Sequence, residues 1–519
     1  MLFNSYPFIF LFLPVVLGMF FLLARADHRI AAGWLAAASL FFYGWWNPVY
    51  LWLLLASIVW NFAMGRVITR LAGHGATARG IALFVAIGLN LGVLGYFKYS
   101  GFLLENLATA FGTGWHVESF VLPLGISFYT FTQIAFLVDA WRGEVKEYSF
   151  LHYLLFISYF PHLLAGPILH HRDIMPQFDR DETYRPDARM IVTGLMIFFM
   201  GLFKKVVLAD GIAPYIGPGF EAARIGQASM LDAWGAGLGF GLQIYFDFSA
   251  YSDMAIGVSR MFGVRIPLNF NSPFQAQNIT EFWQRWHISL TRFLGDYLFA
   301  PLGGRKRSGQ RRAISLVATM LLAGLWHGAG WTFIAFGGLH ATYLLIHYNW
   351  RVWQRKGARR RDATTFGILW SSALTFLAWV FGAVMFRADS VGTWWNMVKA
   401  MIGVNGLRLP EIWQTQMGKV GVALEYAGIV FGPVAAPAAI KALAWSVPLL
   451  LISALLPNTQ RIMGTYLSKD YRSADIAEPA VFVNLRFAPT AGWAVLLGLC
   501  ATISLLNMTR ISEFLYYQF

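Results

Sequence analysis

The sequence predicts an all-α protein that crosses a membrane many times. Hydrophobic residues make up 57% of the 519 residues, charged residues make up 13%, and the mean hydropathy is +0.53. Soluble domains contain about 25% charged residues, and one soluble core could not bury this much apolar surface. Because backbone polar groups in a bilayer must be satisfied within the chain, we expect the spanning segments to be helices.

The apolar runs are the candidate spans of one transmembrane domain over residues 1–519. A spanning helix needs roughly twenty mainly apolar residues, and several runs are too short or too polar to cross simply. We therefore expect about 11 transmembrane helices plus re-entrant segments. The runs are Pro7–Leu23, Ile30–Trp45, Val49–Met64, Gly80–Phe97, Phe120–Asp139, Tyr153–Leu169, Met190–Leu208, Ala233–Val258, Phe282–Leu302, Ile314–Trp326, Trp331–Tyr348, Phe366–Phe386, Leu443–Leu456 and Trp493–Leu506.

The first run is interpreted as a retained span. Residues 8–23 lack the basic leading region and the small-residue cleavage site of a signal peptide, and further apolar runs follow at once. A later run, 159–167, contains Pro161 and Pro167, which interrupt helical continuity. Broken backbone at membrane depth is tolerated inside protein or beside water, so this segment is a candidate re-entrant piece.

Basic residues in short loops predict the orientation of the chain. The loops 25–29, 66–79 and 142–146 fall at alternate ends of the early spans, which places them in the cytoplasm and the N-terminus outside. The loops 303–312 and 351–361 are then cytoplasmic too. Runs 314–326 and 331–348 would form a hairpin whose tip, near residue 327, lies away from the cytoplasm.

Residues 392–440 are expected to form an extracytoplasmic loop with amphipathic helices. This stretch mixes aromatic, glycine and proline residues with modest hydrophobicity. It carries none of the long apolar runs that a spanning helix requires.

Composition and motifs exclude several classes of function. The net charge of +14 lies in short loops, which suits anionic lipid headgroups rather than nucleic acid. The single cysteine, Cys500, rules out an internal disulfide or a two-cysteine site. No residues stand at zinc-ligand spacing, no phosphate-binding loop or serine-hydrolase elbow occurs, and we expect neither a metal nor a bound cofactor.

Two histidines in apolar surroundings are the candidate catalytic residues. His327 lies between Trp326 and Gly328, and His287 follows Trp286. An ionisable side chain at membrane depth is costly and tends to mark a functional site. Flanking glycines allow close approach of a ligand, Trp326 could wall a dry pocket, and a neutral histidine could act as a general base. The alternative, a core histidine bonded to a carbonyl, is equally compatible with the pattern. His170 and His171 are expected at a cytoplasmic surface.

Two further polar groups are supporting candidates that would line the site or position its histidines. Asp247, Tyr251 and Asp253 lie in one dense polar segment, where the alternative role is to hold helices together. Glu281 and Arg285 have the i,i+4 spacing of a helical ion pair. Their helix could instead anchor at the headgroups.

The ordered motifs closely resemble those of the membrane-bound O-acyltransferase superfamily. The nearest likeness is its bacterial branch that contains the alginate O-acetylation membrane protein and the D-alanyl transfer protein of teichoic-acid synthesis. The likeness spans nearly the whole chain, although Ala250 stands where the branch often has glycine. The segments that carry it are Phe3–Ser5, Phe10–Pro14, Tyr245–Ala255, Asn269–Phe274, Thr280–Leu290, Asp296–Gly304, Leu325–Ala329 and Tyr516–Phe519.

This resemblance implies a fold with a central tunnel, and a reaction. His327 corresponds to the catalytic histidine of the superfamily, and His287 to its second polar position. Acetyl would pass from cytoplasmic acetyl-CoA, a substrate, through a bacterial inner membrane to an exopolysaccharide, with alginate favoured and periplasmic acetyltransferase partner proteins assisting. Basic loops 303–312 and 351–361 suit the phosphates of the donor.

Three alternatives stay open. The acceptor could be cellulose, or the reaction could be acyl or D-alanyl transfer to a lipid or a teichoic acid, which would predict a lateral opening near His327. A proton-coupled transporter with Asp247 and Asp253 as its relay belongs to a different class. It would predict inverted repeats, and the sequence has none that stand out.

Overall fold

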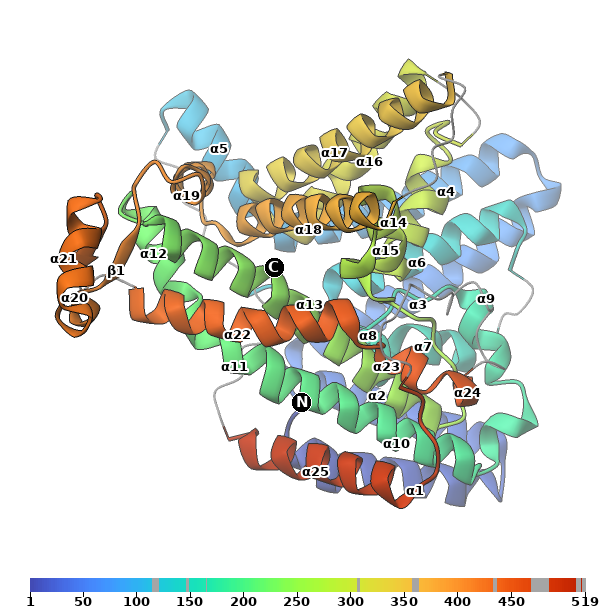
Figure 1. Ribbon diagram of the computed structural model, residues 1–519. Coiled ribbons are helices and arrows are strands. Elements are labelled where there is room, and N and C mark those ends of the chain that lie inside the picture. Colours follow the sequence, from blue (N-terminus) through green and yellow to red (C-terminus); the bar gives the residue numbers. More distant parts are fainter. Residues whose placement is uncertain are drawn as a thin grey trace.

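The computed structural model describes residues 1–113, 121–145, 149–164, 166–305, 309–356, 364–432, 436–467, 485–509 and 515. Regular structure in these residues is helical, apart from one two-stranded parallel sheet of β1 (Arg408–Pro410) and β2 (Val430–Gly432) (Figure 1). The Tyr516–Phe519 motif and parts of the loops 303–312 and 351–361 lie outside the described residues.

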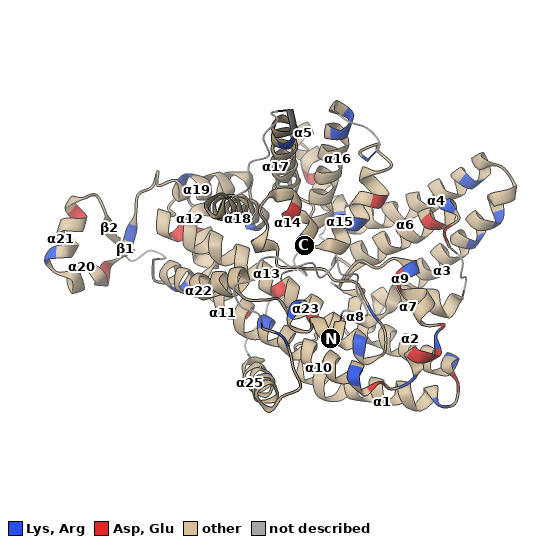
Figure 2. Ribbon diagram, turned by 45° about the vertical axis from the view of Figure 1, so that its right-hand side comes forward, with Lys and Arg blue, Asp and Glu red and all other residues tan. Residues whose placement is uncertain are grey.

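Many of the helices are apolar along their length. Figure 2 shows long helical stretches without charge and places most Lys, Arg, Asp and Glu at helix ends and connections. Six helical segments of the described chain are long and apolar enough to cross a membrane. These are Pro7–Ala24, Val49–Gly73, Ala76–Phe111, Ala188–Arg224, Thr365–Arg387 and Pro437–Leu455.

The first half of the chain forms a run of helices that ends in short, broken elements. The longer ones are α1 (Leu13–Ala24), α2 (His28–Gly44), α3 (Val49–Arg70), α4 (Ala76–Leu94), α5 (Ser100–Phe111), α6 (Ile126–Arg142) and α7 (Phe150–Ser158). The π-helical turns η1 (Pro7–Phe12) and η3 (Gly95–Tyr99) precede α1 and α5, and the shorter elements are η2 (Leu71–Gly73), α8 (Phe160–Leu163), α9 (His171–Ile174), η4 (Met175–Gln177) and η5 (Asp181–Tyr184).

The second half contains the longest helix and most of the candidate site. Its elements are α10 (Ala188–Phe203), η6 (Lys204–Ala209), α11 (Asp210–Ile212), η7 (Ala213–Tyr215), α12 (Gly217–Arg224), α13 (Met230–Met261), η8 (Pro273–Gln275), α14 (Ile279–Arg285), α15 (Ile288–Leu294), η9 (Gly295–Phe299), α16 (Gln310–His327), α17 (Trp331–Lys356), α18 (Thr365–Arg387), α19 (Val391–Met401), α20 (Glu411–Met417), α21 (Lys419–Tyr426), α22 (Ala436–Leu455), α23 (Thr459–Ile462), α24 (Gly464–Leu467) and α25 (Ala491–Asn507).

Helix α13 runs through the middle of the molecule, and nearly all of its side chains are buried (Figure 1). Glycines let α10 lie directly against it. A Cβ on Gly194 would come within 2.5 Å of the Gly257 carbonyl oxygen, and one on Gly201 within 2.8 Å of the Ala250 oxygen. Small residues of this kind allow close helix packing where lipid gives no hydrophobic drive. Helix α13 is thereby fixed as the scaffold of the site.

The predicted helix break around Pro161 is present. Helix α7 ends at Ser158, Tyr159 leaves the helical region with ψ 108°, and α8 begins with Pro161 in its first turn. These residues are buried, and the Leu163 carbonyl lies against Gly125 at the start of α6. The broken segment therefore ends inside the protein, as a re-entrant piece requires.

The run 282–302 is not one span, contrary to expectation. It divides into α14, α15 and the π-turn η9. His287, at the junction of α14 and α15, has φ 43°, a left-handed conformation that no helix can continue through. The predicted hairpin of runs 314–326 and 331–348 is present, as α16 and α17.

Three connections that were expected in the cytoplasm lie on one side of the helices. Arg79 donates to the Ala140 carbonyl at 2.9 Å, and Arg142 donates to the carbonyl of Asp296 at 3.2 Å. The Asp296 carboxylate also pairs with Arg305 at 2.7 Å. The start of α4, the end of α6 and η9 thus lie close together, which fits a single basic face.

Candidate active site

His327 is the last residue of α16, at the tip of the α16–α17 hairpin. The next residue, Gly328, is extended (φ −165°, ψ 152°) and ends the helix without an intrahelical cap bond. A Cβ at Gly328 would overlap the ring of Phe333, so the turn requires glycine here. The close approach that the sequence suggested is therefore made by a ring of the protein itself.

Aromatic rings surround the His327 imidazole. Its centroid lies 4.9 Å from Trp326, 5.2 Å from Phe386 and 6.1 Å from Phe336, all in edge-on arrangements. Rings of this kind exclude water, so electrostatic interactions of a histidine here are strong. Trp326 is itself buried and stacks on Phe131 at 5.6 Å.

His287 is buried, and its ring lies against two aromatic rings. Its ring lies 4.8 Å from that of Phe248, on α13, and 6.2 Å from Trp326. Left-handed backbone in a non-glycine residue is uncommon and tends to be retained at functional sites. In the described residues only Ser272 shares it. The backbone thus pays a conformational cost to hold this imidazole.

Asn269 fixes the orientation of His287. Its Oδ1 lies 3.1 Å from His287 Nδ1 and accepts from the backbone N–H and the hydroxyl of Ser289 at 3.3 and 2.9 Å. Because a backbone N–H can only donate, this amide atom is oxygen, and His287 Nδ1 must be the donor. The neutral imidazole therefore has its lone pair on Nε2.

The rings of His287 and His327 lie near the same tryptophan. Both rings contact the indole of Trp326, which the sequence placed in the site. The structure therefore brings together His327, His287 and Trp326 from three segments. Asn269 and Phe248 were not among the residues predicted for the site, although both lie in segments that carried the family resemblance.

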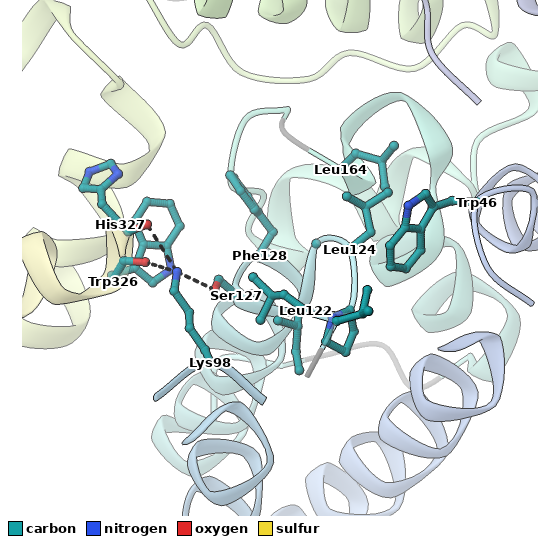
Figure 3. A pocket seen from close by; sticks show the side chains of 13 residues that line it. Trp46, Lys98, Leu122, Leu124, Ser127, Phe128, Leu164, Trp326 and His327 are labelled. Carbon is teal, nitrogen blue, oxygen red and sulfur yellow. Dashed lines mark hydrogen bonds between the residues drawn. The ribbon is translucent and has the colours of Figure 1, made fainter. Parts of the chain in front are cut away.

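A cavity of about 240 Å³ reaches His327 (Figure 3). It lies between the ends of α2 and α4, the start of α6 and the tip of the hairpin, which are the ends farthest from the basic connections. Its polar atoms come from Lys98, Ser127 and His327, and its apolar wall includes Trp46 and Phe128. Figure 3 shows the His327 carbonyl on the side of this cavity and the imidazole pointing away from it, so a substrate hydroxyl on this side would have to pass the end of α16 to reach the ring.

A second cavity, of about 310 Å³, opens near the start of α16. Arg312 and Arg351 lie at its rim, and Leu316, Met320 and Trp283 line its apolar part. Met320 and Trp326 are six residues apart, so the linings of the two cavities come within about 9 Å of one another along the helix. Trp283 and His340, with ring centroids 5.1 Å apart, and Phe336 continue from this cavity toward His327.

The carboxylates of α13 are held by lysines. Lys205 Nζ lies 2.7 Å from Asp247 and 2.7 Å from Asp210, and all three side chains are buried. Lys204 Nζ lies 2.8 Å from Asp253. Thr459 and Gln460 donate to the same carboxylate at 2.7 and 2.6 Å. These contacts favour the packing role among the two that the sequence left open.

Tyr251, Glu281 and Arg285 also have structural contacts. Tyr251 stacks on Phe3 with centroids 4.9 Å apart. The predicted i,i+4 pair is present, with Arg285 Nη2 2.8 Å from Glu281, and Arg285 also donates to the Asn271 carbonyl. This pair fastens α14 to the loop that carries Asn269, and so supports the site from outside.

Two other histidines are more buried than the sequence suggested, and a third, His340, is also buried. His170 and His171, expected at a surface, pack around Asp139 and Tyr297. Burial, together with the charge of Arg292, lowers the pKa of His170 to about 4.

His340 is fully buried, and a Cβ on Gly382 would lie 2.5 Å from its Nε2. Among the described residues, no group of three or more His, Cys, Asp or Glu could hold a metal ion.

Comparison with known proteins identifies the family. The pattern of the membrane-bound O-acyltransferase family matches residues 90–386, which include both histidines. The chain belongs to this family. The prediction of a multi-pass membrane enzyme that transfers an acyl group to a hydroxyl is therefore confirmed.

Similar bacterial members of the membrane-bound O-acyltransferase family carry different substrate names. A peptidoglycan O-acetyltransferase of Helicobacter pylori is 40% identical over 440 residues, covering 79% of this chain and 81% of that protein. A probable alginate O-acetylase of Pseudomonas aeruginosa is 38% identical over 419 residues, covering 79% and 77%. A teichoic acid D-alanyltransferase of Bacillus subtilis is 32% identical over 241 residues, covering 45% and 60%.

Proposed function

We propose that this chain is an O-acetyltransferase of a bacterial inner membrane that acetylates an exopolysaccharide. The single observation that carries the proposal is the pair of cavities at opposite ends of α16, one of which reaches His327. Donor and acceptor would enter from opposite faces and meet at the imidazole. Together the two cavities would form the central tunnel expected from the resemblance.

The second cavity suits a donor of acetyl-CoA chemistry. Arg312 and Arg351 at its rim would attract the phosphates, and its apolar part would take the narrow thioester arm. Acetyl-CoA is a substrate here, and no bound cofactor is needed because the thioester itself supplies the driving force.

The reaction moves one proton in two steps, from the acceptor hydroxyl to His327 and from His327 to the leaving thiolate, and exchanges a C–S bond for a C–O bond. His327 takes the proton of the acceptor hydroxyl while its oxygen attacks the thioester carbonyl carbon. A C–O bond forms, the C–S bond breaks, and the thiolate of the donor leaves and receives the proton. His287, oriented by Asn269, would accept a hydrogen bond at Nε2 and steady the acceptor.

Eleven membrane crossings fit this arrangement. The six apolar segments, joined by α2, α6, α13, α16 and α17, make eleven, and the shorter apolar helix α25 is a further candidate. Residues 392–440 would then stand outside the cytoplasm. There they would face the periplasmic acetyltransferase partner proteins that complete the modification.

Alginate is the first acceptor to test, and peptidoglycan is the second. Similarity to the probable alginate O-acetylases supports the former, and the 40% identity to a peptidoglycan O-acetyltransferase favours the latter. The lysine partners of Asp247 and Asp253 argue against the transporter alternative, because an ion-paired carboxylate is a poor proton relay.

Deletion of the gene in its host tests the proposal. Ester-bound acetate would be measured separately on the exopolysaccharide and on peptidoglycan, after mild alkaline release. We expect the exopolysaccharide to lose acetate and a plasmid copy to restore it. Loss confined to peptidoglycan would support the second acceptor, and unchanged acetate on both polymers would contradict the proposal.

A further inference from the structure

The end of α16 that carries His327 is capped by another part of the chain. The last carbonyls of a helix have no partner within it and must be satisfied from elsewhere. Because Gly328 is extended, α16 has no cap from its own continuation. The carbonyls of Leu325, Trp326 and His327 need other donors.

The π-turn η3, at the end of α4, supplies those donors, and Figure 3 shows the one that comes from Lys98. Tyr99 Oη donates to the Leu325 carbonyl at 2.9 Å. Lys98 Nζ donates to the Trp326 carbonyl at 2.5 Å and lies 3.4 Å from that of His327. Two adjacent side chains of η3 therefore reach three successive carbonyls of α16.

The charge of Lys98 matches its position. Besides the two carbonyls, its Nζ bonds Ser127 Oγ at 3.3 Å, and within the described part of the chain these acceptors are all uncharged oxygens. The C-terminus of a helix carries the negative end of its dipole and stabilises a nearby cation. The ammonium and the helix end thus stabilise each other at the wall of the cavity.

The same segment also holds the other side of the hairpin tip. Asn106, on α5, accepts from the Trp331 indole N–H at 2.9 Å, and Phe102 packs edge-on against Trp331 at 5.7 Å. Trp331 is the first residue of α17. Lys98, Tyr99, Phe102 and Asn106 therefore contact both helices that flank the turn 328–330.

We propose that Lys98 and Tyr99 are positioning residues that hold His327 in its reactive orientation. This inference rests on the proposed function, because it assumes that the His327 imidazole takes part in acyl transfer. Without the two donors, the last turn of α16 would have to find other partners for its carbonyls. The imidazole, attached to that turn, would move with it.

The effect on catalysis should exceed the effect on binding. A displacement of about 1 Å at a reacting group can cost about 100-fold in rate. The rest of the cavity wall at His327, and the second cavity with Arg312 and Arg351, would be unchanged. Loss of the donors should therefore lower kcat and leave KM nearly as it is.

Four variants of the full-length enzyme test the positioning role of Lys98 and Tyr99. For each variant in proteoliposomes, kcat per folded protein and the KM values for donor and acceptor would be measured. Lys98→Met removes the ammonium and keeps the chain length, Lys98→Arg keeps a donor, and Tyr99→Phe removes one hydroxyl. Ser100→Ala is the matched control, since within the described residues its Oγ donates to the Tyr96 carbonyl one turn before it and to no atom of α16.

We expect kcat to fall about 100-fold in Lys98→Met and about 5-fold in Tyr99→Phe. In Lys98→Arg, kcat should lie between the values of Lys98→Met and the wild type. In Ser100→Ala it should equal the wild-type value. Unchanged kcat in Lys98→Met and Tyr99→Phe would overturn the inference. A raised acceptor KM with normal kcat would also overturn it, by making Lys98 a substrate-binding group. An inactive wild type would instead contradict the proposed function.

Discussion

The Oδ1 atom of Asn269 lies 3.1 Å from Nδ1 of His287 and sets which ring nitrogen carries the proton. The loop before α14 and the left-handed junction after it are thereby joined, because the Ile288 N–H also donates to the Asn269 carbonyl at 2.9 Å. The Asn269 amide orients His287, as the donors of η3 orient the turn that carries His327. Each histidine is held by polar side chains from another segment.

Asn269→Ala should lower kcat by about 100-fold, as expected when a group in general acid–base catalysis loses its correct tautomer. Steady-state kinetics of the purified variant would measure it. Ser252→Ala is the control, because it removes only the 3.3 Å contact of Ser252 Oγ with the Asn269 amide nitrogen. Wild-type kcat in Asn269→Ala would show that the tautomer of His287 is irrelevant.

Lys205→Met should destabilise the fold rather than impair the chemistry. It leaves Asp210 and Asp247 buried without their shared cation, and breaking such a buried pair costs roughly 3–5 kcal/mol. Thermal unfolding in detergent would report a lower midpoint. The exposed pair of Arg224 and Glu221 supplies the control, Arg224→Gln, whose midpoint should be unchanged. A stable Lys205→Met protein that had lost activity would revive a direct role for Asp247.

Gly201→Val should separate α10 from α13. The added Cβ would lie 2.8 Å from the Ala250 carbonyl oxygen, and backbone cannot yield as a flexible side chain can. Overpacking of this kind typically costs about 1–3 kcal/mol. Gly18→Ala, with open space around the new Cβ, is the control. Equal unfolding midpoints for the two variants would mean that the α10–α13 contact is dispensable.

Arg312→Gln and Arg351→Gln should each raise the donor KM about tenfold, since a hydrogen bond to a charged group is worth roughly 1.5–3 kcal/mol. The kcat should be unchanged, because both residues lie at the rim of the second cavity, away from His327. Donor-concentration series at saturating acceptor would measure the effect, with Arg224→Gln as the control. An unchanged donor KM in both variants would indicate that the donor enters by another route.

The sequence was sufficient for the fold class, the family, the α16–α17 hairpin and the break at Pro161, because hydropathy, glycine and proline act locally. It was insufficient where partners come from distant segments. Asp247 and Asp253 looked like relay candidates, and only the packing of η6 and α23 revealed their partners. His170 and His171 looked exposed because their neighbours in sequence are charged.

Lys98 is a residue of the site that the sequence did not reveal. It follows directly on the apolar run Gly80–Phe97, and an ionisable residue at membrane depth is a signal in itself. Its role depends on a contact with carbonyls more than two hundred residues away, however. No local pattern could predict that contact. Asn269, inside a segment that carried the family resemblance, was the more accessible signal.

Acyl transfer by the His327→Ala variant is the most direct test of the account. Purified wild type and variant would be given radiolabelled acetyl-CoA with alginate and with peptidoglycan fragments, and both binding of the donor and label on the acceptor would be measured. We predict normal donor binding and no labelled acceptor in the variant. Labelled acceptor at the wild-type rate in a folded His327→Ala protein would contradict the central role of this histidine.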